Sequence, residues 1–136
     1  MTVKSAEEIP DNWADVIISN HVLEHTLRPF DELRGLYPKV RKGGKIIFVL
    51  PHEKNMLYRP GDINQHLYTW SPMNAGNLFK AAGFNIEKVE TINHRWPPKY
   101  LLLYKILGAK GFYLLCLLYA FIKRDLSQVR VVANKC

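Results

Sequence analysis

The sequence predicts an α/β fold with two parallel strands at its centre. Three patterns support this prediction: a run rich in β-branched residues at 13–19, a helical periodicity over 29–40, and a second apolar run at 45–50. Strand, helix and strand at this spacing form a βαβ unit, and its right-handed crossover places the carboxyl ends of both strands at one edge of the sheet. Ligands of open α/β sheets bind at that edge.

The first helix is expected over 29–40, where the apolar residues recur at steps of three and four. Pro38 lies inside this pattern and predicts a kink or an early end. Gly43 and Gly44 are typical of a helix C-terminus, so the second strand is expected to begin only at Lys45.

The second half of the chain adds one helix and two strands. A long polar connection at 52–70 follows the second strand, and such a connection at the ligand edge is usually functional. Ser71 is expected to cap a helix that runs to Ala82. Alternating apolar residues predict a half-buried strand at 84–90, and the last strand is expected at 129–133.

An apolar helical insertion at 98–127 separates the last two strands. Its longest uncharged stretch, 111–122, is shorter than the ~20 residues that span a bilayer, so a buried or interfacial helix is expected. Three roles stay open: a lid over a ligand pocket, a helix on a membrane surface, or a dimer interface. Basic residues at its ends, Lys99, Lys123 and Arg124, favour a membrane surface contacted by 99–124, and a buried lid suits the apolar pattern equally well.

Composition indicates one globular domain over 1–136, since 48% of the residues are apolar and 23% are charged. Most of the net charge of +7 lies in the last quarter of the chain, beside aliphatic residues, which argues against a nucleic-acid partner. Cys116 and Cys136 have no metal-site or disulfide spacing, and the first residues do not resemble a signal peptide. A cytoplasmic location is expected, and peripheral attachment to a membrane is compatible with it.

Three motifs resemble the class I S-adenosylmethionine (SAM) dependent methyltransferases. They are ADVIISNHVLEH at 14–25, RKGGKIIFVLP at 41–51 and LFKAAGF at 78–84. The resemblance implies the C-terminal half of a Rossmann-like sheet, with family strands in the order 4-5-7-6, the last of them antiparallel, and SAM as the cofactor. The family's glycine-rich loop would lie before Met1, which implies a truncated or split form.

The resemblance also implies which residues meet the cofactor and the acceptor. Ser5 stands where the family has an acidic residue that meets the adenine, and His25 and His66 are placed near the acceptor, where either could act as a base. The residues implied to contact the cofactor are Ala6, Ser19, Asn20, His21 and Leu23.

Plainer interpretations exist for the same side chains. His21 and His25 could simply cap or solvate a helix start. Spacing would allow a metal site of His21, Glu24 and His25. It does not place three such ligands well around one ion, so no metal is predicted. Trp70 is expected to pack in the core, and Tyr68 is equally suited to packing or to stacking on an acceptor.

The sequence therefore predicts SAM-dependent methyl transfer to a small-molecule acceptor, such as a sugar or a lipid-linked compound. The alternative is a non-catalytic binding or scaffold protein derived from a methyltransferase. The strand at 13–19 would lie at an open edge of the sheet, so self-association through this strand is also expected.

Overall fold

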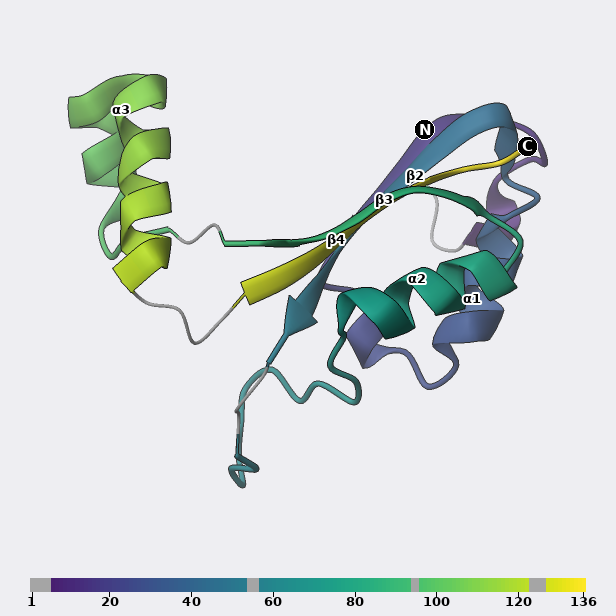
Figure 1. Cartoon of the computed structure of the whole chain (residues 1–136), viewed down its shortest axis with the longest axis horizontal. Helices are drawn as coiled ribbons and strands as arrows, with labels where there is room; N and C mark the ends of the chain where they lie inside the picture. The colour runs from purple at the N-terminus through teal and green to yellow at the C-terminus, as the bar shows by residue number, and fades with distance from the viewer. Residues whose placement is uncertain (1–5, 54–56, 94–95, 123–126) are drawn as a thin grey trace.

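The computed structural model describes residues 6–53, 57–93, 96–122 and 127–136. These residues form a four-stranded sheet, two helices on one of its faces, and an apolar helical element that projects from one end (Figure 1). Ser5, Lys123 and Arg124, which carried expectations about the cofactor and the basic flanks, lie outside the described residues.

The sheet has the predicted topology. Its strands are β1 (Ala14–Asn20), β2 (Val40–His52), β3 (Asn85–Ile92) and β4 (Ser127–Asn134), in the spatial order β1-β2-β4-β3. β1 and β2 are parallel, and β4 is antiparallel to both of its neighbours, β2 and β3. This arrangement confirms the expected order 4-5-7-6 of the family strands with the last strand antiparallel.

Helix α1 (Pro29–Leu36) ends before Pro38, as the proline predicts, but the glycine pair does not end it. β2 already begins at Val40, and Gly43 and Gly44 lie inside this strand. Gly43 adopts a φ of 74° and its N–H bonds the carbonyl of Lys135, so the pair forms an irregularity in the sheet. The expectation of a helix C-terminus here was wrong, because a glycine in the left-handed region can end a helix and can equally form an irregularity inside a strand.

Helix α2 (Pro72–Ala81) begins as predicted. The Ser71 hydroxyl accepts a bond from the N–H of Asn74, and the Asn74 side chain accepts one from the N–H of Ser71, which completes a capping box. Its buried face packs on the sheet, where the rings of Phe79 and Phe48 meet edge to face at 5.1 Å. α1 contributes Leu33 to the same core. This packing fixes the sheet edge that carries the site.

β1 lies at an open edge of the sheet. Within the described ranges it pairs with β2 alone. Its side chains of Val16 and Ile18 are 49% and 72% exposed. An apolar strand edge of this kind is a surface on which a further strand can pair.

α3 (Tyr100–Ile122) is apolar, and in the described part of the chain it is the one helix long enough to cross a membrane by length and composition. Gly108, with a φ of 63°, breaks it into two pieces (Figure 1), and the rings of Tyr104 and Phe112 meet across the break with centroids 5.5 Å apart. Only Cys116 and Ala120 are buried among its described side chains. The structure therefore does not show α3 as a buried lid.

Candidate functional site

The carboxyl ends of β1 and β2 meet at one edge of the sheet, as the βαβ unit predicts. The register also brings the neighbouring strands to this edge, because His52 at the end of β2 pairs with Ser127 at the start of β4. In the same way Ile92 at the end of β3 pairs with Gln128. The turn after β1, the connection after β2, the start of β4 and the insertion α3 therefore all lie at this end of the molecule.

His21 follows β1 directly and is held in the left-handed region, with a φ of 52°. Non-glycine residues seldom adopt this conformation, and such residues are concentrated at functional sites. Its N–H bonds the carbonyl of Val49 at 2.9 Å, which fixes the turn to β2. The ring Nδ1 lies 3.4 Å from Oε1 of Glu24, and the ring Nε2 lies 3.1 Å from the side-chain nitrogen of Gln128.

Glu24 lies in the short 3₁₀ turn η2 (Leu23–His25) and is fully buried. Its neighbour Leu23 packs into the hydrophobic core. Neither of its carboxylate oxygens has a hydrogen-bond partner in the described structure. A buried carboxylate without such partners is costly, so this oxygen pair is the most unusual feature of the edge.

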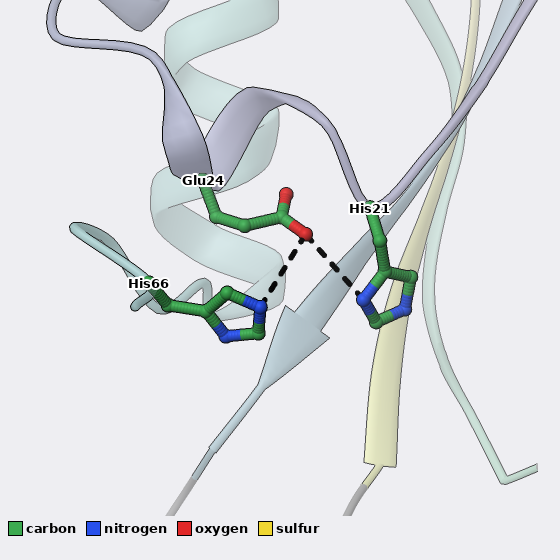
Figure 2. Close-up of side chains that lie close together, drawn as sticks. All are labelled: His21, Glu24 and His66. Atoms are coloured by element: carbon green, nitrogen blue, oxygen red, sulfur yellow. Dashed lines mark ion pairs between the residues drawn. The ribbon is translucent and has the colours of Figure 1, made fainter. Parts of the chain in front are cut away.

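His66 reaches the same carboxylate from the connection after β2 (Figure 2). Its Nε2 lies 3.9 Å from Oε1 of Glu24, and its Nδ1 lies 2.9 Å from Oε1 of Glu53. Two bonds hold the connection on η2 and on the segment after it: the N–H of Leu67 donates to the carbonyl of Glu24, and the Tyr68 hydroxyl donates to that of Leu27. The three residues His21, Glu24 and His66 are called the edge cluster below.

A cavity of about 520 Å³ opens beside the edge cluster, within the connection after β2. His66 and Glu53 line one side of it, together with Arg59, Asp62 and Gln65. This volume falls in the range of small-molecule pockets. The cavity therefore offers space for a ligand next to the cluster.

His25, the other predicted catalytic histidine, is exposed, and its ring centroid lies 5.0 Å from that of His66. It is not the residue that completes a ligand set with His21 and Glu24. That position is taken by His66, because the connection after β2 folds over the turn.

The residues predicted to meet the cofactor are only partly gathered. Ser19 and Asn20 end β1 beside His21, with half-buried and exposed side chains. Leu23 is buried in the core, and Ala6 lies in the 3₁₀ turn η1 (Ala6–Glu8), which contacts α1 and adds nothing to the edge cluster. Their contacts with a cofactor stay predictions.

The aromatic residues of the connection have structural positions. Trp70 is buried in the core, which confirms the packing expected for it. Tyr68 is anchored through its hydroxyl and lies beside Trp70, with ring centroids 5.9 Å apart.

Sequence patterns did not reveal Glu53 and Gln128 as members of the site. Both contact the histidines of the edge cluster, Glu53 through His66 and Gln128 through His21. The only signal was positional, since both residues adjoin the ends of strands at the ligand edge.

The sequence over residues 3–89 matches the family model described as a methyltransferase domain. The chain belongs to this family. Among curated proteins, none matches the sequence significantly.

Solved structures support the same fold for this methyltransferase domain. The cyclase SpnF is similar over 98% of this chain, with 16% identity and a TM-score of 0.63. The 1,6-didemethyltoxoflavin-N1-methyltransferase of Burkholderia thailandensis, with its acceptor and S-adenosylhomocysteine bound, is similar over 96% of this chain, with 15% identity and a TM-score of 0.59. A geranyl diphosphate methyltransferase in complex with GPP and sinefungin is similar over 95%, with 12% identity and a TM-score of 0.59.

This chain spans 56%, 47% and 49% of the lengths of these three proteins, so it corresponds to about half of each. At these identities the similarity concerns the fold. The presence of a cyclase among them also means that the fold by itself does not determine the reaction.

Proposed function

We propose that this methyltransferase domain supports SAM-dependent methyl transfer to a small-molecule acceptor bound at the carboxyl edge of β1 and β2. The observation that carries the proposal is the edge cluster with its adjoining cavity, located where open α/β sheets bind their ligands. Two of the similar structures contain small-molecule acceptors, and one contains S-adenosylhomocysteine, which agrees with this class of reaction.

The end of β1 fits one wall of a SAM site. Ser19 and Asn20 are accessible there, and the chain turns sharply at His21, so backbone groups face the space beyond the strand. The open edge of β1 is where a further strand would pair and supply the opposite wall. Where no further strand pairs with β1, a second copy of the chain can occupy this edge. Light scattering should then show a lower mass of the assembly for the variant Ile18→Lys than for the parent.

SAM supplies a methyl group on a sulfonium, and the protein has to hold donor and acceptor in line and accept any proton that the acceptor loses. Two histidines, His66 and His25, are candidates to accept this proton. His66 has Nδ1 fixed by Glu53 and lines the cavity, whereas His25 lies exposed beside it. The acceptor would lie in the cavity, with its reacting atom next to these rings.

α3 supports a lipid-linked acceptor. Its two pieces expose large apolar side chains, among them Leu101, Ile106 and Phe121 at 65%, 68% and 65%, and Lys105 and Lys110 are exposed between them. Each piece is shorter than the ~20 residues that cross a bilayer, so α3 is suited to lie in the membrane surface. We therefore propose that the protein lies at the periphery of a membrane, on its cytoplasmic side, with the site facing lipid-linked substrates.

Transfer of a labelled methyl group tests the proposal. The protein, as the longest polypeptide that its gene encodes, is incubated with methyl-labelled SAM and with separate lipid and aqueous extracts. Label should appear in a small molecule, and Arg59→Ala, in the cavity wall, should lower the rate by raising KM. His25→Ala and His66→Ala should lower kcat, by the roughly 100-fold or more that loss of a catalytic base costs.

Label in the lipid extract would support the lipid-linked acceptor, whereas label only in the aqueous extract would contradict that part. A non-catalytic binding protein is the second candidate, because a similar fold carries a cyclase, so the fold alone does not require methyl transfer. Saturable SAM-independent binding of a small molecule, with no transfer of label to either extract, would favour it.

A further inference from the structure

We propose that the edge cluster binds a divalent metal ion of the zinc type through Nδ1 of His21, a carboxylate oxygen of Glu24 and Nε2 of His66. These three ligand atoms all lie within 4.8 Å of one another. Ligand atoms about 2.1 Å from one tetrahedral ion lie about 3.4 Å apart. The separations of 3.4 Å and 3.9 Å from Glu24 to the two histidines are close to that value, so a small inward movement of His66 completes the geometry (Figure 2).

The buried carboxylate is the first independent reason to place a cation here. Glu24 is fully buried, and neither oxygen accepts a hydrogen bond in the described structure. Transfer of a carboxylate into such surroundings is unfavourable unless a positive group compensates for it. Among the described residues, no lysine or arginine forms an ion pair with this carboxylate. The two imidazoles are the groups that face it.

The outer partners of the histidines are the second reason. Nδ1 of His66 pairs with the Glu53 carboxylate at 2.9 Å, which keeps the proton on Nδ1 and leaves the lone pair of Nε2 directed at the cluster. Nε2 of His21 lies 3.1 Å from the side-chain nitrogen of Gln128. For Nδ1 to bind a metal, this amide has to turn by 180° so that its oxygen accepts the Nε2–H, an exchange of the amide's two ends that leaves the side chain in place. Metal-binding histidines commonly have such a partner on the second ring nitrogen, because it fixes the tautomer and the ring orientation.

The types of ligand indicate the type of metal. Two imidazole nitrogens and one carboxylate oxygen suit Zn²⁺ and similar transition-metal ions, whereas Mg²⁺ and Ca²⁺ prefer oxygen ligands alone. Three protein ligands leave a coordination position for water or another ligand. The side chain of His21 is 32% exposed, so this position can be reached from solvent.

Metal binding itself does not depend on the proposed methyl transfer. Only the ion's role does: an oxygen of the acceptor would take the open position and be held beside the cavity. With the ion bound, Nε2 of His66 is occupied, and the proton from the acceptor would pass to His25. The metal experiment therefore also decides which histidine can serve as the base.

Titration with Co²⁺, followed by its visible absorption and by competition with Zn²⁺, tests the site. The exposed Cys136 is a competing thiolate ligand, so every variant is made in a Cys136→Ser background after removal of affinity tags and chelatable metal. The parent protein should show the absorption of four- or five-coordinate Co²⁺ and bind one equivalent. Zn²⁺ should displace Co²⁺ and raise the Tm.

His21→Ala, His66→Ala and Glu24→Gln should weaken binding by more than the roughly 10–100-fold expected for the outer-shell variant Glu53→Gln. His25→Ala is the matched control, since it removes a neighbouring imidazole outside the ligand set and should leave the affinity unchanged. Thermal unfolding without metal checks that each variant is folded, and Glu24→Gln, the mildest change, keeps the test valid if an alanine variant unfolds.

Failure of the parent to bind either ion would overturn the proposal, as would full binding by folded His66→Ala. A loss in His25→Ala equal to that in His66→Ala would contradict the assigned ligands. SAM binding without metal binding would overturn the metal site and leave the proposed function standing. Metal binding without SAM binding would support the metal site and contradict the proposed function.

Discussion

Single residues at the edge of the sheet act through conformation as much as through chemistry. His21 adopts a φ of 52°, and Gln65, which precedes His66, adopts a φ of 48°. Both histidines of the edge cluster are thus aimed by a residue in a conformation that L-amino acids seldom adopt. Neither feature can be inferred from spacing, which is why the sequence suggested His25 rather than His66 as the companion of Glu24.

Gly44 is a residue whose role follows from close approach. A Cβ there would lie 2.8 Å from a methyl group of Val40, 2.9 Å from the carbonyl oxygen of Arg41 and 3.0 Å from that of Ala14. Gly44→Ala should destabilise the protein by about 1–3 kcal/mol, because the β1–β2 pairing has to shift.

Gly35 in α1 is the matched control, since a Cβ there meets nothing within 4 Å. Gly35→Ala should leave the free energy of unfolding unchanged or raise it by about 0.5–1 kcal/mol, through the better helix propensity of alanine. Urea denaturation measures both variants. Equal stabilities for the two would contradict the close packing assigned to Gly44.

At the scale of elements, hydrophobic periodicity predicted the strands and helices because each one buries a single face or both faces of a regular structure. The capping residue Ser71 and the early end of α1 before Pro38 were also predictable, since both depend on local backbone chemistry. Gly43 and Gly44 were misinterpreted because the same residue type serves a helix end and a strand irregularity.

α3 shows where local patterns stop being informative. Its apolar composition is evident in the sequence, but the break at Gly108 and the exposure of its side chains depend on how the two pieces fold against one another. A helix that is apolar on all sides can be buried in a core or embedded in a membrane. Only the arrangement in space distinguishes them.

Co-sedimentation with anionic phospholipid vesicles tests the membrane role of α3. The protein should bind, and the double variant Leu114→Asp and Leu118→Asp should lower the bound fraction at least tenfold, because two exposed apolar side chains become charged. Ile63→Asp, at a site 92% exposed but outside α3, is the control and should bind like the parent. Unchanged binding by the α3 variant would exclude this element as the membrane contact.

At the scale of the molecule, the four strands leave an open apolar edge at β1, next to the turn that bears the edge cluster. The candidate site thus consists of the accessible end of β1 and a cavity beyond β2. The sheet order was predictable through the resemblance in sequence. The meeting of Glu53, His66 and Gln128 was not, since it depends on long-range packing.

Calorimetric titration of SAM tests the central claim most directly, performed on this chain and on the longest polypeptide that its gene encodes. We expect saturable binding by the polypeptide that carries both walls of the site, competition by S-adenosylhomocysteine, and weaker binding by this chain alone. Asn20→Leu, at the exposed end of β1, should weaken the binding, whereas Gly35→Ala should not. Absence of SAM binding in both polypeptides would contradict the proposed methyl transfer.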